Sequence, residues 1–191
     1  MDDVTHVDLG HAIISMVEPV RDPERLRAYN QWYEHDHAYG CMTAGPWAFS
    51  YRRFVATSPL KALRYPRAGG AADTVERGSF ISFAWYLADR VDEHFAWLYP
   101  QRKWMSEHGR MNDDREHVST SLYDFRGAVN RPGWPVPAEI ALDHPYEGLV
   151  VAWLDVMDGS SADDVVDFVL QDWAPALLRP DGPAVQDRAR P

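Results

Sequence analysis

Apolar residues in this chain recur at intervals of two in some stretches and of three or four in others, and the two patterns alternate. Two-residue alternation and β-branched runs predict strands at 12–17, 47–56, 79–87 and 117–126. Helical spacing predicts helices after Asp22-Pro23 and after Asp89, because aspartate is a preferred N-cap and proline suits the first helical position. This β-α-β-β-α-β order predicts an α+β fold, a ferredoxin-like antiparallel sheet with two helices on one face.

The chain continues past this pattern through a proline-rich connector at 130–147. The apolar run at 149–156 then predicts a fifth strand, and a third helix ending at a proline follows it. We expect a single α+β-barrel domain over 1–178, with an appended strand and helix at 148–178, and a flexible polar tail at 179–191.

The segment that joins the second and third strands, 57–78, is too long for this plan, because hairpin loops usually have about 2–5 residues. Loops of this length are often lids over a site. An inserted segment without a role is the alternative.

Composition restricts the class of protein. The chain has 191 residues, a formal net charge of -10 and one cysteine, so Cys41 cannot form an internal disulfide. A chain of this length can bury a core without disulfides or metal. No apolar run reaches 18 residues, and the acidic charge disfavours nucleic acid. We therefore expect a cytoplasmic protein that binds neither membranes nor nucleic acid.

Two histidines, an aspartate and a glutamate occupy consecutive positions where the first helix is expected to end, near Tyr39-Gly40. The carbonyl end of a helix favours a protonated imidazole, so His35 or His37 is expected to titrate closer to neutrality than a free histidine. Tyr33 lies one turn before His37 on the same face, which makes this pair a candidate for moving a proton. The candidate catalytic residues are His37, Tyr33, His35 and Asp36. A solvent-exposed cap for His37 and a core position for Tyr33 are the alternative.

Aromatic residues alternate along the second and third strands, and they suit a cavity for a flat, apolar, ring-containing molecule. Ordinary core is an equally good interpretation for any single ring. If Arg53 faces inward it can hold a carboxylate or enolate, whereas solvent is the usual place for arginine. The candidate substrate-binding residues are Tyr29, Asn30, Trp47, Phe49, Tyr51, Arg53, Phe83 and Trp85.

Other kinds of site have little support. His35 and His37 would point in different directions on a helix, so we expect no metal site. The chain contains no glycine-rich nucleotide loop and no Gly-x-Ser-x-Gly motif. Cys41 is either a nucleophile near two histidines or, more commonly for such a residue, a buried thiol. His94 is expected to be exposed or hydrogen-bonded.

The stretch Asn30-Gln-Trp-Tyr-Glu-His-Asp-His37, after a strand and a Pro-Glu-Arg helix start, resembles the N-W-Y-x-x-x-H signature of the EthD-like branch of the dimeric α/β-barrel proteins. The resemblance implies that His37 points into a cavity between sheet and helices and that two sheets pair back to back in a homodimer. The wider superfamily contains cofactor-free monooxygenases, polyketide cyclases, muconolactone isomerases, dehydratases and haem-dependent enzymes. Most single-domain members are shorter, so 57–78 and 148–178 are additions.

We therefore expect a cofactor-independent general acid/base enzyme of isomerase, cyclase or lyase type, in catabolism or secondary metabolism. His37 would shuttle a proton on an apolar, ring-containing small molecule. An oxygen-using monooxygenase-like enzyme, cofactor-free or haem-dependent, is one alternative. A non-catalytic ligand-binding protein is the other.

Overall fold

The computed structural model describes residues 7–133, 136–146 and 148–182. It divides into two compact units, Met1–Phe125 and Arg126–Pro191, which are described in turn. The expected catalytic and substrate-binding residues all belong to the first unit.

A four-stranded antiparallel sheet forms the centre of the first unit. Its strands are β1 (Leu9–Pro19), β2 (Ala48–Val55), β3 (Phe80–Leu87) and β4 (Arg115–Asp124), in the spatial order β2-β3-β1-β4. The prediction of an α+β fold built on an antiparallel sheet is confirmed.

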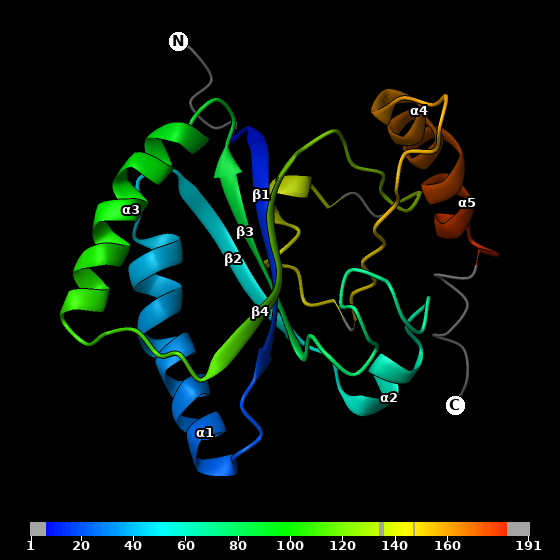
Figure 1. Cartoon of the computed structure of the whole chain (residues 1–191). Helices are drawn as coiled ribbons and strands as arrows, with labels where there is room; N and C mark the ends of the chain where they lie inside the picture. Colours follow the sequence, from blue (N-terminus) through cyan, green and yellow to red (C-terminus); the bar gives the residue numbers. More distant parts are fainter. Residues whose placement is uncertain (1–6, 134–135, 147, 183–191) are drawn as a thin grey trace, which may run out of the picture. The chain divides into compact units, whose positions relative to one another are not determined.

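The helices of this unit are α1 (Pro23–Trp32), the π-helix η1 (Tyr33–Thr43), α2 (Ser58–Ala62) and α3 (Val91–Glu107). Asp22 caps α1 as expected, because its Oδ1 accepts the backbone N–H groups of Glu24 and Arg25. The second predicted cap is wrong: Arg90 precedes α3, while Asp89 has a left-handed backbone with φ of 57°. Helices α1, η1 and α3 lie on one face of the sheet, and α2 lies on the other (Figure 1).

Alternation along β3 decides which side chains face these helices. The Tyr33 hydroxyl of η1 donates to Ser82 Oγ, and the Tyr86 ring contacts His94 of α3, so the even-numbered residues face the helices. Phe83 and Trp85 therefore point to the opposite face, where Phe83 packs edge-on against Phe54.

The long segment between β2 and β3 has a defined conformation. Lys61 Nζ donates to Glu76 O and Ser79 Oγ, both at 2.6 Å, and Arg64 donates to several backbone carbonyls of the same segment. A Cβ on Gly78 would lie 2.2 Å from Met16 Sδ, and Met16 is on the face away from α1 and α3. These contacts tie the segment to that face, so nothing in them favours a lid over the helix side.

The second unit contains η2 (Ala138–Ile140), α4 (Ala162–Asp167), the π-helix η3 (Phe168–Trp173) and α5 (Ala174–Leu178). The fifth strand predicted at 149–156 is not formed, and these residues have no regular secondary structure. The third helix is formed, but it continues past Pro175, which lies in the first turn of α5. Of the predicted tail, residues 179–182 form a turn, and 183–191 lie outside the described residues.

Candidate functional site

The candidate catalytic residues lie in the middle of a long helix rather than at its end. Helix α1 passes directly into η1, and Gly40 does not stop it. The backbone N–H of Ala44 donates to Tyr39 O at 2.8 Å, a bond across five residues that is typical of a π-helix. A Cβ on Gly40 would lie 3.1 Å from Met105 Cε, so glycine here permits close packing with α3.

The wide helical turn places the ring of His37 against two aromatic rings. It stacks on Trp32 with centroids 4.5 Å apart and planes 24° apart, and its centroid is 5.1 Å from that of Tyr33. Trp32 is held in place because its Nε1 donates to Arg110 O at 2.8 Å. The Nδ1 atom of His37 is buried and makes no hydrogen bond within the described part of the chain.

These surroundings keep the His37 imidazole neutral. Burial, together with the positive charges of Arg115 and Arg102, lowers its pKa to about 3. The expectation of titration closer to neutrality is therefore wrong for His37. The carbonyl end of the helix is six residues further along, at Thr43, and the helix-end effect acts only over the last turn.

Asp36 and His35 are not brought to His37. Asp36 forms a bidentate pair with Arg110, with Oδ2 3.1 Å from Nε and Oδ1 2.5 Å from Nη2. His35 is exposed. Of the four candidate catalytic residues, only Tyr33 and His37 lie together.

A second group forms around Arg53, whose guanidinium is buried beneath the helix. Its side chain is 8% exposed, and Nη2 lies 2.6 Å from Glu34 Oε1 and 3.0 Å from Asn30 Oδ1. The Cζ atom lies 4.4 Å from the ring centroids of both Tyr33 and Phe80. Arg53 thus faces inward, which is the condition under which a carboxylate or enolate can bind to it.

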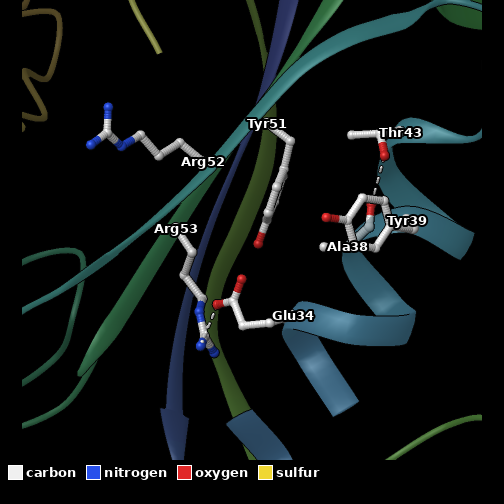
Figure 2. Close-up of a pocket in the computed structure, with 7 residues that line it drawn as sticks. All are labelled: Glu34, Ala38, Tyr39, Thr43, Tyr51, Arg52 and Arg53. Carbon is white, nitrogen blue, oxygen red and sulfur yellow. Dashed lines mark hydrogen bonds and ion pairs between the residues drawn. The ribbon is translucent and has the colours of Figure 1, made fainter. Parts of the chain in front are cut away.

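A pocket of about 320 Å³ lies between β2 and η1. It is lined by Glu34, Ala38, Tyr39, Thr43, Tyr51, Arg52 and Arg53. Figure 2 shows Tyr51 and Arg53 turned toward η1, while Arg52 extends the other way from the strand. Its volume is near the lower end of the usual range for ligand pockets, roughly 300–1,000 Å³.

The tyrosine hydroxyls near this pocket are protonated donors at neutral pH. Burial and the neighbouring Tyr33 raise the pKa of both Tyr29 and Tyr51. Among the described residues, neither the Tyr29 nor the Tyr51 hydroxyl satisfies hydrogen-bond geometry with a partner. Tyr33 Oη donates to Ser82 Oγ at 3.2 Å.

The structure groups about half of the candidate substrate-binding residues. Tyr29, Asn30, Tyr51 and Arg53 lie around Tyr33. The remaining four are placed elsewhere or at the margin. Phe83 and Trp85 are on the opposite sheet face, Trp47 lies before β2 under the guanidinium of Arg90, and Phe49 is half-buried at a register shift in β2.

Three residues of this region were not among the expected site residues. Trp32 stacks on His37, Glu34 pairs with Arg53, and Phe80 lies under the Arg53 guanidinium. Trp32 belongs to the N-W-Y signature, so the sequence offers a signal for it, whereas alternation in the third strand does not say that Phe80 faces the helices. Glu34 lies in the π-helix, and the spacing of apolar residues does not predict a π-helix, so the ion pair of Glu34 with Arg53 could not be expected from the sequence.

Cys41 and His94, the other two candidate reactive side chains, are both buried. Cys41 is buried with its Sγ 3.3 Å from Met105 Sδ, and burial raises the pKa of its thiol, which disfavours a nucleophilic thiolate. His94 is fully buried, contrary to expectation, and neither ring nitrogen makes a hydrogen bond in the residues described. In the same residues, no cluster of three or more His, Cys, Asp or Glu side chains is arranged to hold a metal ion.

Comparisons with protein-family models, with curated proteins and with solved structures found no match to this chain. Among the described residues, no helix is long and apolar enough to cross a membrane.

Proposed function

We propose that the first unit is a ferredoxin-like domain of the EthD-like kind, and that it is a cofactor-independent general acid/base enzyme of isomerase, cyclase or lyase type. His37 takes a proton from a carbon next to a carbonyl of an apolar, ring-containing substrate and returns it elsewhere on the molecule. The observation that carries the proposal is the position of the His37 ring, which stacks on Trp32 and contacts Tyr33 while its buried Nδ1 makes no hydrogen bond to a described residue.

A neutral imidazole is the form that can accept a proton. Because the pKa of His37 is about 3, the ring is available as a base throughout the neutral range. The same low pKa makes it a weak base, so the carbanion that forms needs stabilisation as an enolate. Tyr33 and Trp32 hold the ring in one orientation, which favours a defined direction of proton transfer.

Positive charge near His37 supplies that stabilisation. The guanidinium of Arg115 lies over the Trp32 ring at 4.9 Å, and Trp32 stacks on His37. The charges that lower the His37 pKa also favour a negative enolate oxygen close to the ring. An anion bound there would in turn raise the pKa of His37 and make it a stronger base.

The strand order supports the architectural part of the proposal. The order β2-β3-β1-β4, with α1, η1 and α3 on one face of the sheet, is compatible with a ferredoxin-like sheet. The homodimer implied by the resemblance would use the other face, where Met16 is buried and lies against the 57–78 segment of its own chain. Light scattering in solution measures the oligomeric state.

Hydrogen exchange into a ring ketone tests the chemistry without knowledge of the natural substrate. The protein is incubated in D₂O with 2-tetralone, and loss of the α-proton signals is followed by NMR. We expect the parent protein to accelerate exchange and His37→Phe to lose roughly 10²–10⁴-fold of that acceleration. Tyr33→Phe keeps the ring and should have a smaller effect. His108→Gln, at the exposed C-cap residue that follows α3, is the matched control.

Equal exchange rates for the parent and a folded His37→Phe variant would contradict the proposed role of His37. Because its pKa is about 3, the enzyme-catalysed rate should show no loss from His37 protonation between pH 8 and pH 5. If the catalysed exchange were instead lost with a midpoint near pH 6.5 because His37 becomes protonated, the low pKa of His37 would be contradicted.

A further inference from the structure

Arg53 is a buried cation with one side of its guanidinium unused. The Nη2 atom pairs with Glu34 and Asn30, whereas Nη1 is buried and no described acceptor satisfies hydrogen-bond geometry with it, although the Tyr29 hydroxyl lies near the guanidinium. A guanidinium has five N–H donors in a fixed plane, and an unpaired buried donor is energetically costly. One edge of the Arg53 guanidinium is therefore available to an acceptor that the chain itself does not supply from these residues.

Aromatic rings hold this cation in position. The Arg53 Cζ lies 4.4 Å from the ring centroids of Tyr33 and Phe80 and 6.0 Å from that of Tyr29. Cation–π contacts of this kind stabilise the charge without occupying its N–H donors. The guanidinium is thus positioned before any ligand arrives, which reduces the ordering cost of binding.

Glu34 is the only acidic residue that lines the pocket, and its side chain reaches solvent. Glu34 lines the same pocket as Arg53, and its side chain is 51% exposed compared with 8% for Arg53. The carboxylate is therefore the partner that can move, while the buried guanidinium stays in place. Figure 2 shows the Glu34 carboxylate and the Tyr51 hydroxyl both directed toward the Arg53 side of the pocket.

We propose that this pocket binds a carboxylate attached to a single aromatic ring, and that the ligand carboxylate replaces Glu34 on the Arg53 guanidinium. Arginine prefers planar, bidentate pairing with carboxylates, and the buried Nη1 provides the second donor. Tyr51, with its hydroxyl protonated at neutral pH, and Tyr39 provide ring surface on either side of the pocket. Binding here requires no turnover and does not depend on the proposed role of His37, which is not among the lining residues.

Benzoate and its neutral analogue benzamide are the probes, titrated into the full-length protein and followed by isothermal calorimetry. We expect the parent to bind benzoate more tightly than benzamide. Glu34→Gln, which removes the competing carboxylate, should bind benzoate on the order of tenfold more tightly than the parent. Arg53→Gln should lose the preference for benzoate. Arg25→Gln, which removes an exposed ion pair to Asp114, should bind like the parent.

The Glu34 variant keeps the test decisive even if Arg53→Gln does not fold, because Glu34 is half exposed. Equal affinities for benzoate and benzamide would overturn the proposal. So would a Glu34→Gln variant that binds benzoate no better than the parent, or the absence of benzoate binding at millimolar concentration in both proteins. The benzoate titration does not depend on the 2-tetralone exchange, so the proposed binding at Arg53 and the proposed catalysis by His37 are tested independently.

Discussion

Acidification is expected to destabilise the folded protein through His37. The pKa of this ring is about 3 in the folded state, compared with 6.5 for a histidine in the unfolded chain. The unfolded state therefore takes up a proton first as the pH falls. The stabilisation linked to His37 is complete above pH 6.5 and is lost progressively as the pH falls toward 3.

The magnitude follows from the difference between the two pKa values. Each pKa unit corresponds to about 1.4 kcal/mol, so the full effect between pH 6.5 and pH 3 is about 5 kcal/mol. Between pH 8 and pH 5 the expected loss is about 2 kcal/mol, because only about 1.5 units of the interval lie below the unfolded-state pKa. Most surface carboxylates remain ionised in this range, which separates the effect from general acid unfolding.

Urea denaturation, followed by tryptophan fluorescence at pH 8 and pH 5, measures this loss. The comparison variant is His37→Phe, which keeps a ring against Trp32 and Tyr33 but cannot be protonated. We expect the free energy of unfolding to fall by about 2 kcal/mol more in the parent than in the variant. Equal losses in the two proteins, or an NMR titration of the His37 Cε1–H signal with a midpoint above pH 6, would refute the reasoning.

Three further substitutions test the packing of the fold by urea denaturation. Gly45→Ala would place a Cβ 2.3 Å from Cε1 of the fully buried His94, and overpacking of this kind should destabilise by about 1–3 kcal/mol. Lys61→Met removes the ammonium that ties Glu18 to the 57–78 segment, and loss of one partner of a mostly buried pair should cost about 3 kcal/mol. Ser161→Ala removes a capping box at the start of α4 and should destabilise the second unit by about 1 kcal/mol, with faster amide exchange in α4.

The strands of the first unit could be predicted because alternation reports burial directly. In β2 and β3 one face contacts the helices and the other does not, so the two-residue period in the sequence matches the structure. Alternation alone does not say which face meets the helices. For this reason the sequence pattern places Phe83 and Trp85 among the expected cavity residues, although Phe80 and Ser82 are the residues on the helix side.

The predicted fifth strand shows where propensity fails without a partner. Residues 149–156 are rich in β-branched and apolar side chains, yet Val150 is 92% exposed and Met157 just beyond is 77% exposed. A strand is stabilised by neighbours that pair with its backbone and cover its side chains. Apolar composition in this segment was therefore not sufficient to form a strand.

The geometry of the candidate site depends on a feature that periodicity does not report. At about 100° per residue, Trp32 and His37 would lie about 140° apart around an α-helix, and their rings would not stack. The π-helical turns bring them onto one side, where the ring centroids are 4.5 Å apart. The same wide turn begins at Tyr33, whose ring contacts both His37 and the Arg53 guanidinium. Because π-helical segments are rare and occur often at functional sites, the position of this one favours the interpretation that His37 and Arg53 are held for chemistry or binding rather than for packing alone.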